Sequence, residues 1–379
     1  MSLVLSTTSR RYRTVDDLPA SALRLMQLAG EQDYHHRVEW YRTLASHAID
    51  PADETWFHVL ENRASGEALA VLPLLQPRGR LAPGRARTAL SLTTYYSSLY
   101  APILAPGHDE AELLDRLFRE VCAGTPTWDV LRLSPLAADA PGFAMLVQAL
   151  RRQGMFVQPY FCFGNWYLDV AGRSFIDYLT TRPSVLRHTL GRKTKKLISS
   201  GRAKIRIVTG GDELSEGVDD YRRVYDRSWK VPEPWPGFVP GLIATFAGLG
   251  SLRLGLVHVD GEPAAAQIWI VNGSTASIYK LAYDERFADL SVGTVLTAHL
   301  MQQVIDVDKV TTVDYLTGDD PYKKDWMSHR RERWGVLALN RRTVRGIAGI
   351  LRHGGGRFVK TFFSRARRRV PSSEAGLGG

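Results

Sequence analysis

Residues 275–335 read TASIYKLAYDERFADLSVGTVLTAHLMQQVIDVDKVTTVDYLTGDDPYKKDWMSHRRERWG. This pattern predicts a strand at Thr275–Tyr283, a helix at Thr294–Ile305 and a strand at Val310–Leu316. A glycine turn precedes the helix, and a polar turn follows the second strand. Free backbone amides at the start of such a helix favour a phosphate group. The order is therefore typical of a cleft that binds a phosphorylated carrier and acts on the group it carries.

The same alternation of strands and helices extends in both directions along the chain. Leu252–Val259 and Ala264–Val271 flank Asp-Gly-Glu-Pro and predict a hairpin, and Trp334–Asn340 predicts a final strand. The first half shows a similar succession of elements, and this likeness suggests an internal duplication. Its elements are expected at Thr55–Leu60, Leu69–Gln76, Tyr95–Leu104, Ala111–Val121, Trp128–Leu133, Gly142–Arg151 and Met155–Phe163.

The length and composition indicate two packed globular domains. The chain has 379 residues, whereas an ordinary domain has about 100 to 200. Its 44% hydrophobic content supports sizeable cores. The predicted fold class is α/β, with mixed sheets and a basic helical tail.

The net charge of +10 is unevenly distributed. Residues 1–170 contain 16 Arg, no Lys and 18 acidic residues, whereas the rest of the chain contains 33 basic and 21 acidic residues. Such an excess indicates nucleic acid, a membrane surface or an anionic small molecule as a partner. Residues 182–206 hold nine Lys or Arg and no acid, which fits either a solvated helix face or a surface that faces an anion.

The tail after Asn340 is also basic. Its apolar residues are spaced as in an interrupted amphipathic helix, namely Val344, Ile347, Ile350, Leu351, Phe358, Phe362 and Phe363. This helix either docks on the body of the protein or lies on an anionic membrane surface.

Several classes of protein lack their signal in this sequence. There is no GxxxxGK[ST], strand-linked GxGxxG, HExxH or GxSxG motif, and the ten histidines show no ligand spacing, so no metal is expected. Cys122 and Cys162 are too few for a disulfide framework and are expected to be buried thiols. No window approaches the 18 apolar residues of a spanning helix. The cytoplasm is therefore the expected location, at the inner face of the membrane if the tail binds there.

The turn before the predicted helix is the first candidate site. It consists of Ser291, Val292, Gly293 and Thr294. Gly293 permits a ligand to approach the backbone closely, and the helix dipole favours a phosphate or pyrophosphate. An ordinary Ser or Thr N-cap explains the same residues without a ligand.

The polar turn after the second strand is the second candidate site. Asp314 ends the strand, and Tyr322 and Lys323 follow within a few residues. A tyrosine hydroxyl, with a pKa of about 10, can protonate a leaving thiolate. Lys323 can neutralise a phosphate or pair with Asp314. A structural turn capped by carboxylates is the alternative.

An aromatic and proline-rich loop, Ser228–Pro236, lies between two predicted helices. Such loops often line a substrate cleft, and Glu233 can accept hydrogen bonds from an amine. Rigid packing of Trp229 and Trp235 explains the loop equally well. Tyr95, Tyr96 and Tyr100 form a comparable cluster in the first half, for which core packing is the simpler interpretation.

Five segments together resemble a known family over about residues 160–340. They are GEPAAAQIW (261–269), IYKLAYDE (278–285), VGTVL (292–296), VDYLTGDDPYKKDWM (313–327) and RRERWG (330–335). This combination resembles the C-terminal half of the BioF2-like, CelD-type acetyltransferases of the GNAT superfamily.

The resemblance implies two GNAT folds packed side by side, as in the related Fem-type peptidyl aminoacyltransferases. The implied domains are 1–165, 166–340 with the acyl-donor site, and a basic helical tail at 341–379. In the superfamily, the pyrophosphate of coenzyme A lies on the turn that corresponds to Ser291–Thr294, and a tyrosine matched by Tyr322 often serves the leaving thiolate. The chain keeps only Gly293 of the glycines in the usual Q/RxxGxG/A signature. Fem-type enzymes use an aminoacyl-tRNA as donor instead.

The sequence therefore predicts an acyl-CoA-dependent N-acyltransferase that acts on an amine of a sugar, amino acid or cell-envelope precursor. Backbone donors of the central strand would hold the acyl carbonyl while Tyr322 protonates the sulfur and Glu233 or Asp314 takes up the amine proton. One alternative is a Fem-type aminoacyl-tRNA-dependent transferase. Another is a non-catalytic GNAT scaffold that binds a polysaccharide-synthesis complex or a membrane through its tail.

The candidate residues fall into three groups. For catalysis they are Tyr322, Asp314 and Glu233; for the donor they are Lys280, Leu281, Ala282, Ser291, Val292, Gly293, Thr294 and Lys323; for the acceptor they are Trp229, Lys230, Trp235 and Tyr96.

Overall fold

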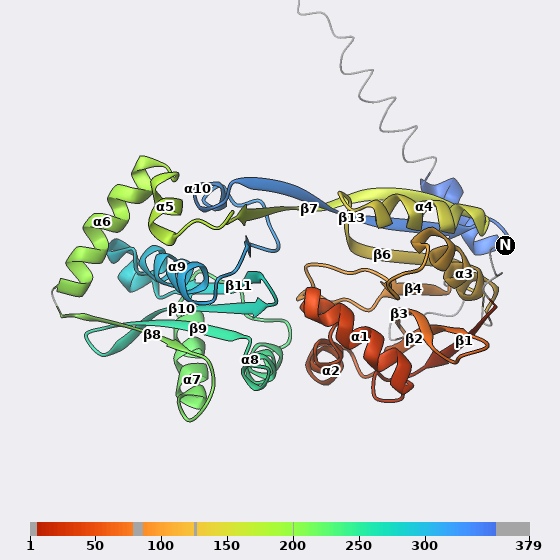
Figure 1. Ribbon diagram of the computed structural model, residues 1–379, viewed down its shortest axis with the longest axis horizontal. Coiled ribbons are helices and arrows are strands. Elements are labelled where there is room, and N and C mark those ends of the chain that lie inside the picture. Colours follow the sequence, from red (N-terminus) through yellow and green to blue (C-terminus); the bar gives the residue numbers. More distant parts are fainter. Residues whose placement is uncertain (1–5, 79–85, 125–126, 200, 354–379) are drawn as a thin grey trace, which may run out of the picture.

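The strands of both halves join in one mixed sheet of 13 strands (Figure 1). The computed structural model describes residues 6–78, 86–124, 127–199 and 201–353. The strand order is β1-β2-β3-β4-β6-β13-β7-β12-β11-β10-β9-β8, with β5 paired to β3. This order is symmetric about the β13–β7 pair, with five strands of the path on each side of the pair. The two halves therefore have equivalent layouts, as an internal duplication would produce.

The elements of the first half run from the N-terminus to β7. They are β1 (Thr7–Tyr12), α1 (Ala20–Gln32), η1 (Tyr34–His36), α2 (Val38–His47), β2 (Glu54–Asn62), β3 (Ala68–Gln76), β4 (Thr88–Ser91), β5 (Ile103–Leu104), α3 (Glu110–Ala123), β6 (Val130–Ala137), α4 (Pro141–Arg152) and β7 (Met155–Asp169).

The elements of the second half follow the same plan, with additional helices before its hairpin. They are α5 (Phe175–Thr180), α6 (Ser184–Ser199), β8 (Ala203–Val208), α7 (Glu213–Asp226), α8 (Phe238–Gly248), β9 (Leu252–Val259), β10 (Glu262–Asn272), β11 (Thr275–Tyr283), η2 (Glu285–Leu290), α9 (Val292–Gln302), η3 (Gln303–Val307), β12 (Thr312–Asp314), α10 (Lys323–Trp326) and β13 (His329–Asn340).

The two long strands β7 and β13 cross from one half to the other. β7 follows α4 of the first half and pairs with β12 of the second, and β13 follows α10 of the second half and pairs with β6 of the first. The two strands also pair with each other along their whole length, from His329–Tyr167 to Asn340–Met155. Figure 1 shows them running together above both halves. Each half therefore contributes its last strand to the sheet of the other.

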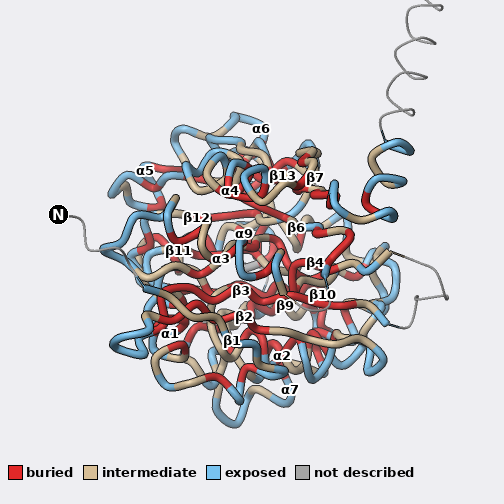
Figure 2. Tube along the Cα trace, turned by 90° about the vertical axis from the view of Figure 1, so that its right-hand side faces the viewer, coloured by how far each residue is buried: buried red, intermediate tan, exposed pale blue. Residues whose placement is uncertain are grey.

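Three apolar cores cover the faces of this sheet. One lies under α3 and α4 in the first half, and a second lies under α5, α6 and α9 in the second half. The third joins the halves, because α2 packs against α8 through the rings of Trp40 and Phe238, 6.1 Å apart. Figure 2 shows the buried strands in the interior, with exposed turns around them.

The structure confirms most of the elements expected from the sequence. The strand at Thr275–Tyr283 has the predicted bounds, and the hairpin of β2 and β3 extends one or two residues beyond them. The strand expected at Tyr95–Leu104 was wrong. Only Ile103–Leu104 is a strand, and Tyr95 lies in a turn with 74% of its surface exposed. The two cysteines are half-buried, so the expectation of buried thiols was also wrong.

The tail is helical over residues 344–353, and the rest of it lies outside the described residues. Val344, Ile347 and Leu351 are exposed on this helix. Contact of the tail with a membrane stays a prediction. In the described part of the chain, no helix is long and apolar enough to cross a bilayer.

Candidate active site

The sheet opens between β11 and β12. Their parallel pairing covers Thr275–Ser277 and Thr312–Asp314 and ends there. The register of β11 on β10 also shifts here, so that Tyr279 is an extra residue between Ile278 and Lys280. Such a bulge increases strand twist and changes the direction of the following side chains. The residues of β11 beyond Ile278 line cavities instead of pairing with β12.

One of these, the donor cavity, has a volume of about 500 Å³. It lies between β11, α6, the start of α9 and the segment around α10. Six of the residues expected at the site line it, namely Trp229, Leu281, Ala282, Gly293, Thr294 and Tyr322. The structure thus brings together the helix start, the central strand and the tyrosine that the sequence placed in one cleft.

The start of α9 contributes backbone amides to the donor cavity. The first hydrogen bond of this helix runs from Val295 N to Ser291 O at 3.0 Å, so the three preceding amides have no acceptor within the helix. Ser291 adopts a left-handed φ of 56°, and its side chain does not cap the helix. A Cβ on Gly293 would lie 3.3 Å from Cδ1 of Tyr283, so the backbone approaches β11 closely at this residue. Val292 is buried.

Buried hydrogen bonds fix the start of α9 on β10. Gln267 Nε2 donates to Gly293 O at 3.0 Å and to Thr297 Oγ1 at 2.8 Å. Trp269 Nε1 donates to Gln267 Oε1 at 2.9 Å and sets the orientation of the amide. The helix start is therefore held in place before any ligand binds.

Tyr322 lies at the boundary of two cavities. It lines the donor cavity and also a second one of about 220 Å³, the central cavity. Its ring packs edge to face on Tyr315, 5.9 Å away, and 42% of its surface is exposed. Partial burial and the carboxylate of Asp320 raise the pKa of the Tyr322 hydroxyl above its usual value. The hydroxyl is therefore protonated at neutral pH.

Lys323 holds the polar turn that positions Tyr322. Its Nζ donates to Thr317 O at 2.5 Å and to Gly318 O at 3.3 Å, and it pairs with Asp320 at 3.1 Å. Burial lowers the pKa of this ammonium, although the neighbouring carboxylates favour its charge. The sequence left open whether Lys323 pairs with Asp314. In the structure, Lys323 makes these contacts instead.

The central cavity is lined by Lys230, Lys280 and Tyr96. The ammonium of Lys280 pairs with Glu233 Oε1 at 2.6 Å, and both side chains are largely buried. Burial alone would raise the pKa of Glu233, but the hydrogen bond and charge of Lys280, together with the Tyr225 and Tyr96 hydroxyls, lower the pKa below its usual value. Burial and the charge of Lys280 lower the pKa of Lys230.

The aromatic loop closes this cavity on the side of the first half. Tyr96 stacks on Phe238 at 3.9 Å, and its hydroxyl donates to Trp235 O at 3.3 Å. Trp229, at the other end of the loop, packs against Tyr283 beside the donor cavity, with 4.6 Å between the ring centroids. The loop therefore borders both cavities, as expected of a cleft-lining segment.

Asp314 lies apart from Tyr322, in a third cavity of about 350 Å³ between the two halves. Its Oδ1 accepts hydrogen bonds from Asn165 Nδ2 and Leu316 N, both at 2.6 Å, and its Oδ2 pairs with Arg331 at 2.5 Å. Both oxygens are therefore occupied. This cavity, the inter-half cavity, shares Ser98 and Leu316 with the central cavity.

Several lining residues were not found from the sequence. Gln267, Tyr283, Thr297 and Tyr315 lie in segments predicted as strands or a helix, and they were not among the candidate residues. Asp314 is the candidate residue that lines the inter-half cavity, and the cavity itself was not predicted, because it is assembled from α1, η1, β12 and β13, which are far apart in the chain. Among the described residues, no group of three or more His, Cys, Asp or Glu side chains could hold a metal ion.

A known domain model matches part of the second half. Residues 184–324, from the start of α6 into α10, match the model of the acetyltransferase (GNAT) domain. The second half of the chain is thus similar to a GNAT acetyltransferase domain, the kind of domain expected of an acyltransferase. The narrower resemblance to BioF2-like and CelD-type proteins stays a prediction.

Solved structures extend the likeness to both halves. The chain is similar to FemX, with a TM-score of 0.60 at 10% identity over 87% of this chain and 96% of that one. It is also similar to a conserved protein of unknown function from Bacteroides thetaiotaomicron, with a TM-score of 0.50 at 11% identity over 86% and 93%. A tandem GNAT protein from the clavulanic acid biosynthesis pathway matches with a TM-score of 0.49 at 16% identity over 87% and 98%.

The first two likenesses show a shared fold and nothing about substrate. Together with the domain match and the symmetric sheet, they confirm the predicted α/β fold of two GNAT-like units. No curated protein matches the sequence. The domain bounds at residues 165 and 340 stay a prediction.

Proposed function

We propose that the protein is an acyl-CoA-dependent N-acyltransferase. One observation carries this proposal: Tyr322, the start of α9 at Gly293 and Thr294, and the unpaired part of β11 all line the donor cavity. An acyl thioester needs these three things, namely a site for its phosphates, a strand edge for its carbonyl and an acid for its sulfur.

The residues present fit such a donor. The first amides of α9 would hold the pyrophosphate, and the absence of a side chain at Gly293 keeps the backbone accessible. Leu281, Ala282 and Trp326 give the donor cavity an apolar wall for the pantetheine arm and acyl chain. When bound, the donor supplies the activated acyl group.

Tyr322 is the proposed general acid. The amine nitrogen forms the new bond to the acyl carbon while the carbon–sulfur bond breaks, and the phenol protonates the departing thiolate. The raised pKa of Tyr322 keeps the phenol protonated until this step. Backbone groups of Lys280–Ala282 would hold the acyl carbonyl in this scheme.

The proposal is tested by separating donor binding from chemistry. Acetyl-CoA is expected to raise the melting temperature of the wild type, by the equivalent of about 2.7 kcal/mol at 100 times its dissociation constant. Tyr322→Phe should keep this shift but release free thiol about 100-fold more slowly with an amine acceptor. Tyr12→Phe, on β1 at the far edge of the sheet, is the matched control. No thermal shift with any acyl-CoA, or unchanged turnover in Tyr322→Phe, would contradict the proposal.

An aminoacyl-tRNA donor is the second candidate, and one feature of α6 favours it. This helix lines the donor cavity through Leu186 and Thr189, while Arg187, Arg192 and Lys196 on it are exposed. A tRNA would contact such a face through many phosphates, so its affinity should fall steeply between low and physiological salt. Acetyl-CoA makes few such contacts, and its binding should change little over the same range.

A further inference from the structure

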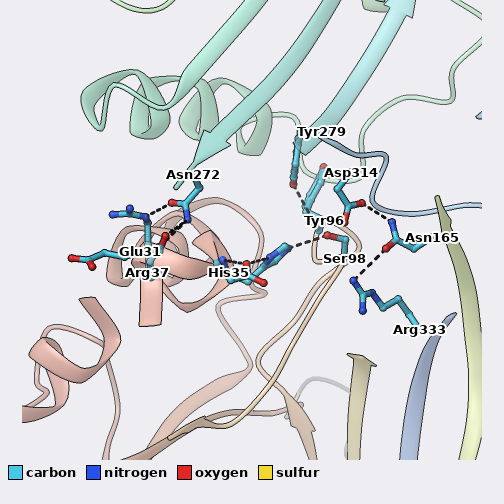
Figure 3. Close-up of polar contacts among 12 residues, drawn as sticks. Glu31, His35, Arg37, Tyr96, Ser98, Asn165, Asn272, Tyr279, Asp314 and Arg333 are labelled. Atoms are coloured by element: carbon cyan, nitrogen blue, oxygen red, sulfur yellow. Dashed lines mark hydrogen bonds and ion pairs between the residues drawn. The ribbon is translucent and has the colours of Figure 1, made fainter. Parts of the chain in front are cut away.

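The inter-half cavity is a built polar site. Its volume of about 350 Å³ lies at the small end of the range for ligand pockets. The first half contributes Asp33 and Ser98, and the second half contributes Asp314, Arg331 and Arg333. Figure 3 shows polar side chains that face one another from η1, the loop around Ser98, β7, β12 and β13, namely His35, Ser98, Asn165, Asp314 and Arg333.

Arg333 is a buried cation with too few partners. Only 5% of its side chain is exposed. Among the described residues, its Nη2 donates one hydrogen bond, to Asn165 Oδ1 at 3.2 Å, and its Nε has no partner. The carboxylate of Asp139 forms a long ion pair with Arg333, with 3.8 Å between Asp139 Oδ1 and Arg333 Nη1. Buried charges are normally paired and hydrogen-bonded, so this guanidinium fits a bound anion.

The neighbouring charges already have partners. Arg331 donates from Nε to Asn165 Oδ1 at 2.7 Å and pairs with Asp314 at 2.5 Å. β-Strand alternation directs Arg331 and Arg333 to the same face of β13, whereas Arg330 pairs with Asp319 and Glu332. Arg333 is therefore the cation of this strand that is open to a ligand.

The inter-half cavity leads to the reacting groups. It shares Ser98 and Leu316 with the central cavity, and the central cavity shares Leu281, Tyr315 and Tyr322 with the donor cavity. The inter-half cavity therefore adjoins the central cavity, which in turn adjoins the donor cavity at Tyr322.

We propose that the inter-half cavity binds the acyl acceptor, and that this acceptor is a small amine that also carries a carboxylate, as an amino acid does. The acceptor role rests on the proposed function. The planar guanidinium of Arg333 matches a carboxylate in two parallel hydrogen bonds. The lining holds three carboxylates, of Asp33, Asp139 and Asp314, against two guanidiniums. A singly charged carboxylate with a nearby ammonium suits this balance better than a phosphate dianion.

The test compares amines that differ only at the anionic group. The standard amino acids, their C-terminal amides and phosphoethanolamine are screened for thermal shift without donor, then for acylation with acetyl-CoA. The best amino acid should raise the melting temperature and react about 10- to 100-fold more efficiently than its amide. Arg333→Met should remove this preference and the thermal shift. Arg330→Gln, a neighbour on the same strand, should keep both.

Each outcome decides one question. If every amide reacts as well as its acid, or if phosphoethanolamine is preferred, the carboxylate assignment is wrong although the acyltransferase proposal stands. If acetyl-CoA neither binds nor reacts while an amino acid still raises the melting temperature through Arg333, the proposed function fails and the cavity assignment holds. Because Arg333→Met can alter packing, Arg333→Lys is a second variant; it keeps the charge and should retain part of the preference.

A chain of three side chains also leads from the cavities into the first half. His35 Nδ1 lies 2.7 Å from Asp33 Oδ1, and His35 Nε2 lies 3.0 Å from Ser98 Oγ. Asp33 also accepts the backbone N–H of His35 at 2.9 Å, which fixes the ring. With Nδ1–H donated to the carboxylate, Nε2 is left to accept the hydroxyl proton of Ser98. Ser98 lines both the inter-half and the central cavities.

The geometry points to Ser98 and His35 as the route by which the acceptor amine loses its proton, if the proposed function holds. The protonated amine gives one proton to Ser98 Oγ as the Ser98 proton passes to His35 Nε2, and Asp33 stabilises the resulting imidazolium. The free amine then forms the new carbon–nitrogen bond and releases its second proton to water, while the carbon–sulfur bond breaks and Tyr322 protonates the sulfur. Exchange with water then deprotonates His35 and reprotonates Tyr322.

The relay is tested with two acceptors of different basicity. His35→Asn should lower kcat about 100-fold for an ordinary alkyl amine without changing acetyl-CoA binding. The loss should be much smaller with hydroxylamine, which is already unprotonated at neutral pH. Ser98→Ala, a smaller change less apt to unfold the protein, should show the same pattern. Equal losses with both acceptors would assign His35 and Ser98 a purely structural role.

Discussion

The two halves share a strand order but differ at the helix that connects their parallel strands. In the first half this helix is α3, between β4 and β6, and in the second it is α9, between β11 and β12. Asp109 caps α3 by accepting from Ala111 N and Glu112 N at 2.8 and 3.2 Å, and Glu110 also lies in the first turn. The first turn of α9 has neither a side-chain cap nor an acidic residue.

This difference shows how little a GNAT-like unit must change to become a donor site. The Asp109 carboxylate satisfies two amides of α3, and the acidic residues there repel an anion, whereas the first amides of α9 stay available to one. The central strands differ as well. β11 carries Lys280 into a buried pair with Glu233, while β4 consists of Thr88–Ser91 and has no charged residue.

The ion pair gives the largest expected effect on stability. Replacing Glu233 by Leu leaves the ammonium of Lys280, only 14% exposed, without its partner, and should lower the free energy of unfolding by about 3 to 5 kcal/mol. The double variant Glu233→Leu, Lys280→Met makes β11 more like β4. Its free energy of unfolding should fall much less than that of Glu233→Leu. Urea denaturation of the two single variants and the double variant measures the coupling. A single-variant loss below about 1 kcal/mol would show that the pair is effectively solvated.

One substitution can make the first turn of α9 resemble that of α3 and should weaken donor binding. Thr294 occupies the third position of α9, where α3 has Glu112. Thr294→Glu should weaken acetyl-CoA binding about tenfold or more, because a carboxylate then faces the donor phosphates. Titration calorimetry at fixed salt measures the change, and the loss should shrink as salt is raised.

Two controls separate charge from shape in this substitution. Thr294→Gln has a similar size without the charge and should lose much less affinity. Glu112→Thr makes the opposite change in α3 and should leave donor binding unchanged. If Thr294→Glu binds acetyl-CoA as tightly as the wild type, the start of α9 does not hold the phosphates, and the contrast between the helices has no functional meaning.

The sequence predicted those parts of the fold that depend on local pattern. The hairpin of β9 and β10 follows from two apolar runs around Asp260 and Gly261, and β11 follows from its alternation. The exchange of β7 and β13 could not be predicted, because it depends on pairing between residues such as His329 and Tyr167, far apart in the chain.

The candidate site residues divide in the same way, into those close together in the sequence and those far apart. Gly293, Leu281 and Tyr322 lie within one contiguous stretch, so a local reading brought them together. Ser98 and His35, by contrast, are 63 residues apart, and Ser98 lies where a strand was wrongly expected. The sequence does contain a signal for Arg333, because strand alternation along Arg330–Arg333 places Arg331 and Arg333 on the same face. A strand rich in arginine, however, reads first as a solvated edge.

The smallest expected effect concerns the caps themselves. Asp109→Ala removes two hydrogen bonds from the start of α3 and should lower the free energy of unfolding by about 1 kcal/mol. Ser291→Ala should cost less than about 0.5 kcal/mol, because Ser291 makes no cap hydrogen bond and Ala keeps the same left-handed backbone. Neither change should affect the fold, so both can be measured by thermal unfolding without donor. With saturating acetyl-CoA, both variants should gain the same stabilisation as the wild type. A larger loss for Ser291→Ala than for Asp109→Ala would mean that the serine closes α9, and that this helix start resembles α3 after all.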